Sequence, residues 1–413
     1  MKLRHILCKR CARAREKTTF PGVSEKKERV FLFCVVYHEN IGRNMLTMKF
    51  ELSKKDKDSF LALNDVLDHN VDCTVLINNY MDYGYTQITA DDVERLMLTG
   101  LSSKDAFSTL LQEFLELDSE KKADQFLIEK NHILDFRPYD RNDFINNPYT
   151  LKLNEIKEKA TNGIKIAFNY FEPYEGFLLD YGHAEKEDGY IERNRYSYFE
   201  EKTPYLVLLQ KNTVWMSITP FEIETMKEPL EQARGKVLTF GLGLGYFAYM
   251  AARKKEVTEV KVIEANRSVI DLYHSDIEPH LEEDVRKKIK IECKNAYAYL
   301  EKSKDYDMLF VDIYHNEIDG LKTYAILEKR AKKIKLPFRI NYWIENAILT
   351  SLRRYVIDTL YCHMEGIEME KDEYVTAVEE ALEDMDFVSF SQIENLITDE
   401  GLKEFAARLN LNA

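Results

Sequence analysis

The chain has 413 residues, of which 45% are hydrophobic and 31% are charged; this composition is typical of folded proteins, and the length predicts roughly two or three folded units. Its formal net charge of −14 argues against general binding to nucleic acid, because phosphate contacts need clustered Lys and Arg side chains. No apolar run approaches the roughly 20 residues that span a bilayer, and no secretory leader is recognisable, so we expect a cytoplasmic protein that binds neither nucleic acid nor membrane.

Residues 1–47 form a basic N-terminal extension, which contains 11 Lys or Arg residues and 4 Glu residues. Two methionines near its end offer alternative starts, so the extension is either a poorly ordered segment, not necessarily translated, or a basic arm that contacts a partner. Within it, His5-x2-Cys8-x2-Cys11 has the spacing of zinc ligands. No second pair of this kind follows, so no metal site is expected, and six scattered cysteines suit a reducing compartment.

Residues 48–164 predict a helical accessory domain. Apolar residues recur at helical spacing in the segment that begins at Ser103. Thr89 precedes a second helical segment, where its side-chain oxygen can accept a hydrogen bond from a free N–H group of the first turn. No catalytic constellation is recognisable in this region.

A hairpin and a short helix are expected next, at the start of a domain that we assign to residues 165–365. The apolar runs 205–210 and 212–217 predict two antiparallel strands with a turn near Asn212. The sequence from Thr219 to Glu222 fits a capping box with proline at the first helical position, and the helix is expected to stop at Gly235.

The same domain begins with many aromatic residues. Tyrosines are frequent between Tyr170 and Tyr205. These side chains either line a substrate pocket or lie half-buried in sheets and interfaces, as tyrosines in such positions commonly do. The sequence alone leaves both interpretations open.

From Gly235 onward the chain alternates strands and helices. Strands are expected at 236–240, 259–263, 289–292, 306–311 and 338–343, with helices at 246–255 and 267–273. Repeated strand–helix units predict an α/β fold in which helices cover both faces of a parallel, Rossmann-like sheet. Helices dominate from residue 345, and residues 366–413 predict an acidic helical C-terminal tail that is a solvated helix face or an oligomer contact.

The first chemical signal is a glycine loop between the first predicted strand and its helix. Gly241, Gly243 and Gly245 alternate with leucines. Glycine lets the chain turn tightly and lets a ligand approach the backbone, next to free N–H groups at a helix N-terminus. A dinucleotide fingerprint would carry its third glycine at position 246, where this chain has Tyr246, so NAD is disfavoured.

Polar residues follow the next three predicted strands. Glu264 ends the second strand, where a carboxylate can accept both hydroxyls of a ribose. Asn295 and Ala296 follow the third strand, where a side-chain amide can meet an adenine edge, and Asp312 closes the fourth. Ligands of open α/β sheets bind at the carboxyl ends of the strands, so we expect these residues and the glycine loop to form one nucleotide site.

Across residues 215–345 these motifs resemble the class I S-adenosylmethionine-dependent methyltransferases. The Tyr-Asp before the fourth strand, Asp312 after it and the preceding hairpin resemble the spermidine-synthase-like branch of that superfamily. The resemblance implies S-adenosylmethionine bound by the glycine loop, with Glu264 on the ribose and Asn295 near the adenine. It also implies in-line transfer of a methyl group to an acceptor, with no metal ion.

The sequence departs from the family at several positions. Thr239 replaces the acidic residue usual within the first strand, and Asn295 replaces an acidic adenine contact. Tyr314 and His315 follow Asp312 where spermidine synthases carry small residues and a second Asp, which favours methyl transfer over aminopropyl transfer. Both Tyr314 and His315 are candidates for the pocket or for a surface loop.

The sequence therefore predicts a methyltransferase that acts on an unidentified small molecule or protein side chain, as a monomer or a homo-oligomer. Asp312 would bind the acceptor, act as a general base, or only hydrogen-bond the cofactor or a loop. The alternatives are a polyamine aminopropyltransferase with the same site and a non-catalytic nucleotide-binding module.

One further motif resembles a known box without matching it. Asn146-Asn147-Pro148-Tyr149 is similar to the Asn-Pro-Pro-Tyr box of amino-group methyltransferases. It lacks the second proline, precedes the glycine loop and has no apolar strand leading into it. We therefore expect an ordinary turn.

Overall fold

The computed structural model describes residues 37–38, 48–84, 86–153, 156, 158–161, 164–210 and 212–412. The zinc-like spacing of His5, Cys8 and Cys11 and nearly all of the basic extension lie outside the described residues. The one described piece of that extension is strand β1 (Tyr37–His38), which pairs antiparallel with β14 (Glu368–Met369).

The centre of the fold is a five-stranded sheet in the order β11-β10-β9-β12-β13, and every pairing in it is parallel. Its strands are β9 (Gly235–Phe240), β10 (Val257–Glu264), β11 (Ile289–Cys293), β12 (Met308–Val311) and β13 (Ile340–Tyr342). The five predicted strands are thus confirmed, and the order places the first strand in the middle, as in a Rossmann-like sheet. β9 and β12 read as nearly continuous apolar runs because both of their faces are buried.

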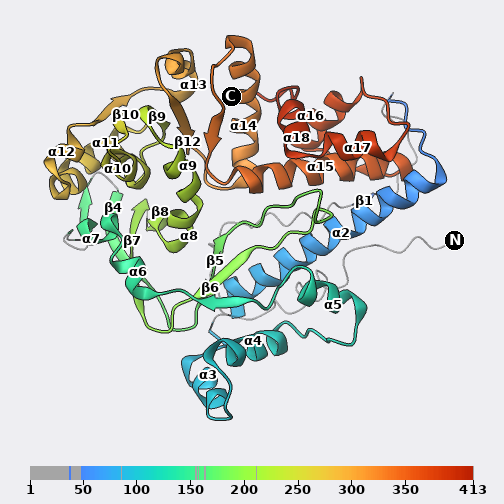
Figure 1. Ribbon diagram of the computed structural model, residues 1–413, viewed down its shortest axis with the longest axis horizontal. Coiled ribbons are helices and arrows are strands. Elements are labelled where there is room, and N and C mark those ends of the chain that lie inside the picture. The colour runs from blue at the N-terminus through green and yellow to red at the C-terminus, as the bar shows by residue number, and fades with distance from the viewer. Residues whose placement is uncertain are drawn as a thin grey trace.

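Helices connect and cover these strands (Figure 1). They are α10 (Tyr246–Arg253), α11 (Arg267–Leu272), η2 (Tyr273–Ile277), η3 (Glu278–His280), α12 (Glu283–Arg286), α13 (Ala296–Tyr299), η4 (Leu300–Asp305) and α14 (Glu317–Ile334). No antiparallel strand follows β13 in this sheet among the described residues, and α15 (Glu345–Glu365) leads the chain away instead.

The N-terminal region is mainly helical, as predicted. It contains α2 (Lys54–Asn79), η1 (Tyr80–Gly84), α3 (Ala90–Met97), α4 (Ser103–Phe114), α5 (Lys122–Glu129), α6 (Arg141–Ile145) and α7 (Pro148–Leu153). Thr89 and Asp92 form a reciprocal capping box at α3, and Ser102 caps α4 through the backbone N–H of Asp105. The second half of α2, η1, α3, α4 and α5 surround a second apolar core, whereas the first half of α2, α6 and α7 pack into the core around the parallel sheet.

Two smaller sheets join the helical region to the parallel sheet. The first contains β2 (Phe136–Pro138), β6 (Arg195–Tyr198) and β5 (Gly176–Asp180); the second contains β3 (Lys159–Thr161), β4 (Ile164–Phe171), β7 (Thr203–Gln210) and β8 (Thr213–Ile218). β7 and β8 form the predicted hairpin, and Asn212 in its turn has a φ of 65°. β2 pairs with β6, so a strand from the region expected to be helical belongs to a sheet built by the next region.

The capping box at Thr219 and Glu222 is present, but the helix that follows is not continuous. α8 (Pro220–Thr225) ends at Met226, and α9 (Lys227–Gln232) ends before Gly235. Gly235 adopts a φ of 62° and begins β9. The prediction of one helix up to Gly235 was wrong, because Pro229 and the turn at Met226 divide it.

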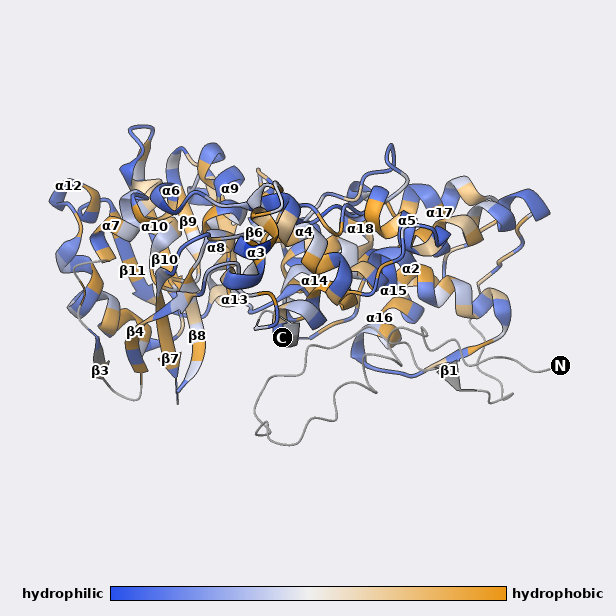
Figure 2. Cartoon of the chain, turned by 90° about the horizontal axis from the view of Figure 1, so that it is seen from below, coloured by the Kyte–Doolittle hydropathy of each residue, from blue (hydrophilic) through white to orange (hydrophobic). Residues whose placement is uncertain are grey.

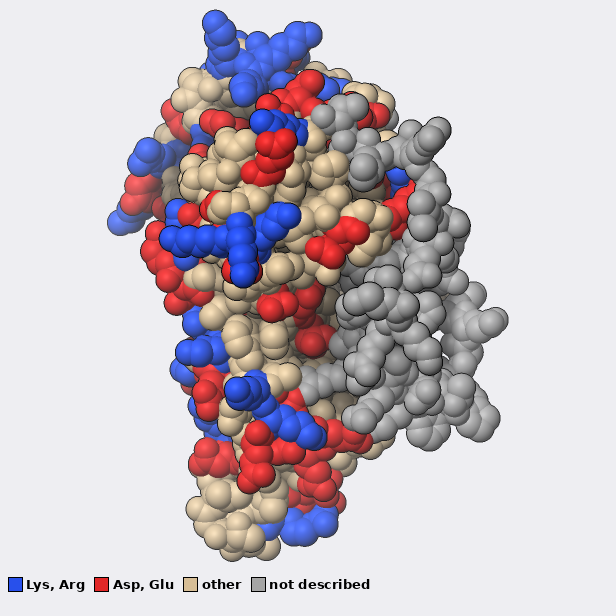
Figure 3. All heavy atoms as spheres, turned by 90° about the vertical axis from the view of Figure 1, so that its right-hand side faces the viewer, with Lys and Arg blue, Asp and Glu red and all other residues tan. Residues whose placement is uncertain are grey.

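The C-terminal segment is helical, as predicted, but it is not a solvated tail. It contains α16 (Glu373–Leu382), α17 (Phe390–Leu396) and α18 (Asp399–Ala406), whose apolar residues join the main core. The backbone of Lys49 and Glu51 hydrogen-bonds to Phe387, and α15 and α17 both contact α2. Figure 2 shows hydrophobic and hydrophilic residues mixed in these helices, and Figure 3 shows charges of both signs on the outer face at this end.

Two buried arginines of α15 form ion pairs with the neighbouring helices α2 and α18. Arg353 is 2% exposed; its guanidinium donates to the carbonyl of Ile397 (3.0 Å) and to Asp399 (2.7 Å). Arg354 pairs with Asp358 on its own helix and with Asp68 on α2 at 2.7 Å. Since a buried charge left without its partner is costly, these pairs hold α15 in one position against α2 and α18.

Among the described residues, no helix has the length and apolar character needed to cross a membrane.

The C-terminal helices are expected to contribute to the stability of the whole protein. Leu402 in α18 is fully buried, so Leu402→Ala should lower the free energy of unfolding by roughly 2–5 kcal/mol. Leu98, at the end of α3, is 88% exposed, and Leu98→Ala should change the free energy of unfolding by less than about 0.5 kcal/mol. Urea unfolding followed by circular dichroism measures both variants. Equal midpoints would show that α18 does not belong to the cooperative core.

Candidate functional site

The glycine loop joins β9 to α10 and is shaped by three left-handed glycines. Gly241, Gly243 and Gly245 have φ angles of 97°, 52° and 86°. A Cβ on Gly241 would lie 1.9 Å from the carbonyl oxygen of Asp312, and one on Gly245 would lie 2.5 Å from the ring of Tyr273. A Cβ on Gly243 would meet only the Met216 sulfur, at 3.8 Å. Gly241 and Gly245 are therefore required by packing, whereas Gly243 leaves its side of the loop open to an approaching group.

Glu264 ends β10 and holds the glycine loop. One carboxylate oxygen accepts a hydrogen bond from the backbone N–H of Leu242 (3.0 Å), and the other accepts from that of Asn266 (2.6 Å). Each oxygen retains acceptor capacity, because an ionised carboxylate offers about four acceptor sites. The side chain is thus fixed beside the loop and can still accept two hydroxyl groups.

Asn295 and Ala296 lie at the end of the neighbouring strand β11. The Asn295 side-chain oxygen caps α13 by accepting from the backbone N–H of Ala298 (3.1 Å), and Ala296 is buried beneath it. The cap uses the amide oxygen only, while the amide NH2 group is the donor that an adenine nitrogen would need.

Asp312 follows β12, and its backbone N–H donates to the carbonyl of Phe240 at the end of β9 (2.9 Å). The pKa of its carboxyl group is raised from 3.8 to about 7, chiefly by burial and then by the nearby carboxylates of Glu222 and Glu264, against a smaller opposing effect of His315. Parallel pairing places the ends of β9 and β12 side by side, which brings Asp312 to the glycine loop.

Glu222 is a site residue that the sequence analysis assigned only to a capping box. Its carboxylate accepts from the Ser217 hydroxyl (2.9 Å) and from the backbone N–H of Thr219 (2.7 Å), and burial raises its pKa. No Lys or Arg in the described part of the chain forms an ion pair with Glu222, Glu264 or Asp312. Three partly buried carboxylates therefore share one site without a neutralising cation, and no local sequence signal links Glu222 to Asp312.

Tyr314 and His315 do not complete this site. Tyr314 is buried, stacks on Trp343 and donates its hydroxyl to the Trp343 carbonyl. His315 is exposed and hydrogen-bonds to Asp319 at 3.2 Å. The surface-loop interpretation holds for His315, whereas Tyr314 is packed in the core, which neither interpretation predicted.

The tyrosine-rich stretch is mainly part of the cores. Tyr174, Tyr190, Tyr196 and Tyr198 are all less than 9% exposed, and Tyr196 stacks on Phe136 at 4.9 Å. The rings of Tyr174, Tyr196 and Tyr198 belong to the second apolar core, and the ring of Tyr190 belongs to the main core, where it lies against Arg353. They pack the structure instead of lining the candidate site.

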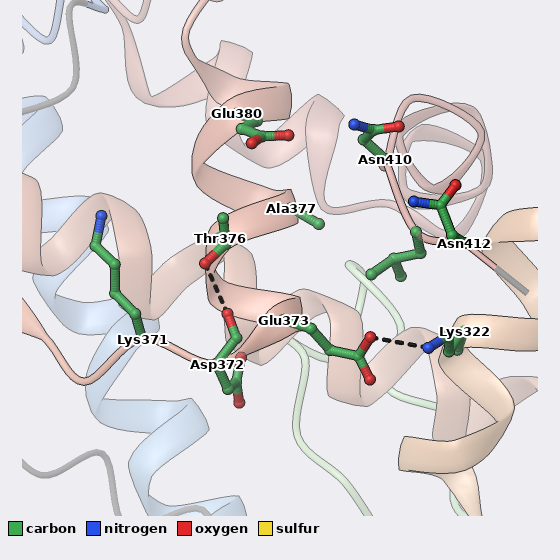
Figure 4. A pocket seen from close by; sticks show the side chains of 10 residues that line it. Lys322, Lys371, Asp372, Glu373, Thr376, Ala377, Glu380, Asn410 and Asn412 are labelled. Carbon is green, nitrogen blue, oxygen red and sulfur yellow. Dashed lines mark hydrogen bonds and ion pairs between the residues drawn. The ribbon is translucent and has the colours of Figure 1, made fainter.

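A separate cavity of 560 Å³ lies between α14, α16 and the C-terminal residues (Figure 4). Its charges pair with one another or with close neighbours: Lys322 bonds to Glu373 (2.9 Å) and Lys371 to Glu379 (2.8 Å). None of the predicted site residues lines it. Within the described residues, no group of three or more His, Cys, Asp and Glu side chains could hold a metal ion.

Comparisons with known proteins give little further information. No family model matches the chain, and neither does any curated protein. Among solved structures, spermidine synthase from Thermotoga maritima aligns with 12% identity and a TM-score of 0.25, over 50% of this chain and 72% of that one. A likeness this remote carries no conclusion about function.

The raised pKa of Asp312 predicts a pH-dependent contribution to stability. Between pH 3.8 and about 7 the folded protein binds a proton that the unfolded chain has released, so this contribution is full at low pH and is lost as the pH rises to about 7. Asp312→Asn cannot ionise, so it does not lose this contribution. The melting temperature of the variant minus that of the unsubstituted protein should therefore increase as the pH is raised from 4 to 7.5.

Asp319→Asn is the matched control. The pKa of Asp319 is lowered, chiefly by its hydrogen bond to His315, so its ionised form stabilises the fold. Above about pH 5 Asp319 is ionised in both the folded and the unfolded protein, so the control should melt below the unsubstituted protein by an amount that stays nearly constant up to pH 7.5. A pH-independent difference for Asp312→Asn would show that Asp312 ionises as freely as an exposed carboxylate.

Proposed function

We propose that the chain is an S-adenosylmethionine-dependent methyltransferase of class I type that acts on a small molecule or a protein side chain. The observation that carries the proposal is the single edge of the parallel sheet where Gly243, Glu264 and Asp312 lie together. Ligands of open α/β sheets bind at this edge, where the strand order reverses.

The residues present fit this cofactor. Glu264 has acceptor sites left for two ribose hydroxyls, and the Asn295 amide has donors left for an adenine nitrogen. The unneutralised carboxylates favour a sulfonium and an ammonium group, whereas they would repel the diphosphate of a dinucleotide. A second argument against NAD is Tyr246, which stands where a dinucleotide fingerprint has its third glycine.

The chain's own residues would have two tasks in the reaction. S-adenosylmethionine, when bound, supplies an already activated methyl group, so catalysis depends chiefly on orientation. The loop and Glu264 would orient the nucleoside. Asp312, whose pKa is raised to about 7, is suited to hold an acceptor amine or to take its proton near neutral pH.

Aminopropyl transfer from decarboxylated S-adenosylmethionine is the second candidate. The observation that favours it is the cluster of Glu222, Glu264 and Asp312, because this donor lacks the carboxylate that such a cluster would repel. Both candidates use the same nucleoside site and differ in the donor they prefer.

Calorimetric titration with four ligands tests the proposal. We expect S-adenosylmethionine and S-adenosylhomocysteine to bind with dissociation constants in the micromolar range, and NAD not to bind. Tighter binding of decarboxylated S-adenosylmethionine would replace methyl transfer by aminopropyl transfer. Binding without turnover on any acceptor would indicate a non-catalytic module, and no binding of any of the four would refute the proposed cofactor.

A substitution at Glu264 tests the ribose assignment. Glu264→Gln keeps the shape but turns an NH2 group toward one of the two backbone N–H donors or toward the ribose, so S-adenosylmethionine should bind at least about tenfold more weakly. Glu259→Gln, on the same strand but before its end, should bind like the unsubstituted protein. Equal affinities in the two variants would remove Glu264 from the site.

A further inference from the structure

A buried tyrosine supports the glycine loop on the side away from Gly243. Tyr149 has no exposed surface, and its hydroxyl donates a hydrogen bond to the carbonyl of Leu244 within the loop. A Cβ on Gly245 would lie 3.1 Å from this hydroxyl. Its ring packs against the rings of Tyr246 (5.7 Å) and Tyr249 (5.0 Å) at the start of α10.

The turn predicted at Asn146–Tyr149 delivers this side chain. The Asn147 side-chain oxygen accepts from the backbone N–H of Tyr149 (2.9 Å), and Pro148 opens α7. The same amide donates to the hydroxyl of Tyr246 (3.4 Å). The motif is thus a turn, as expected, and both polar atoms of the Asn147 side chain are engaged, the oxygen with the backbone of Tyr149 and the amide nitrogen with Tyr246.

The other end of α7 is linked to α10 indirectly, through Glu282 at the start of α12. Lys152 pairs with Glu282 at 2.9 Å, and Glu282 also accepts a hydrogen bond from the Tyr249 hydroxyl (2.9 Å). α7 therefore lies along α10 with contacts at both ends, and Tyr149 cannot withdraw without breaking them.

The loop itself has few other supports. Its backbone is held by the Gly241 N–H on the Ile263 carbonyl (2.9 Å), by the Leu242 N–H on Glu264, by the Thr239 hydroxyl on the Gly241 carbonyl (3.4 Å), and by one internal bond from Gly245 to Leu242. Three glycines in five residues have many alternative conformations, so a loop of this composition needs external contacts to keep one shape.

We propose that Tyr149 is a positioning residue that holds the glycine loop in its ligand-binding shape from a helix outside the parallel sheet. The hydroxyl fixes the Leu244 carbonyl on one side while Glu264 fixes the Leu242 N–H on the other. The identity of the ligand rests on the proposed function; the effect on the loop does not.

Tyr149→Phe and Tyr273→Phe form a matched pair for the test. The Tyr149 hydroxyl and the Tyr273 ring both lie next to Gly245, but the buried Tyr273 hydroxyl has no hydrogen-bond partner among the described residues. Each variant keeps its ring and loses one oxygen. Melting temperature and two further quantities are measured: amide exchange of the peptide that contains residues 241–248, without ligand, and the affinity for S-adenosylmethionine.

We expect Tyr149→Phe to exchange this peptide about tenfold faster and to bind S-adenosylmethionine about tenfold more weakly, because the competent loop conformation becomes less populated. Tyr273→Phe should match the unsubstituted protein in both. Peptides of α14 should exchange equally in all three proteins, which separates a local effect on the loop from a general loss of stability.

Three results would overturn the inference: unchanged loop exchange in Tyr149→Phe, faster exchange throughout the protein, or faster loop exchange with unchanged affinity. If the unsubstituted protein binds none of the four ligands, the proposed function fails by itself. The exchange comparison then still decides whether the Tyr149 hydroxyl holds the loop.

Discussion

The close passage of Gly241 beside Asp312 is the constraint on which the candidate site depends. No side chain fits between them, since a Cβ at Gly241 would stand 1.9 Å from the Asp312 carbonyl oxygen, and the φ of 97° also favours glycine. This passage lets the ends of β9 and β12 stay paired up to Phe240 and Val311. Because the pairing continues to the last residue, the loop after β9 and the carboxylate after β12 emerge side by side.

The electrostatics of the site follow from the same arrangement. Three strand or hairpin ends each contribute one carboxylate, and no Lys or Arg of the described residues forms an ion pair with any of them. Burial first, and the two neighbouring carboxylates second, oppose the ionisation of Asp312, which therefore retains a proton up to about pH 7. A fold retains such repulsion where a ligand of opposite charge relieves it, and perturbed carboxylates are enriched at functional sites for that reason.

The rest of the chain makes this edge rigid. The N-terminal helices, the two small sheets and the C-terminal helices do not form separate appendages, because α2 contacts α15 and α17 and the C-terminal helices join the core of the parallel sheet. Figure 1 shows α2 running beneath α15 and the small sheets joining that end to the parallel sheet. The parallel sheet is thereby braced by segments that precede and follow it in the chain, among them α7, which carries Tyr149.

The sequence by itself determined the features that arise from contacts within a few residues. The helix cap at Thr89, the capping box at Thr219, the hairpin at Asn212, the five strands and the glycine loop all follow from local geometry, in which neighbouring side chains and backbone groups meet whatever the rest of the chain does. Glu264, Asn295 and Asp312 were placed at strand ends because parallel strands align their carboxyl ends.

Only the tertiary structure decided which distant segments meet at those features. Tyr149 reaches the Leu244 carbonyl across 95 residues, Glu222 joins Asp312 through the position of a hairpin, and Phe387 pairs with the segment before α2. Each contact depends on how amphipathic faces pack in three dimensions. A periodic pattern shows that a face is apolar, but many faces in one chain are chemically alike, and only shape complementarity selects the partner.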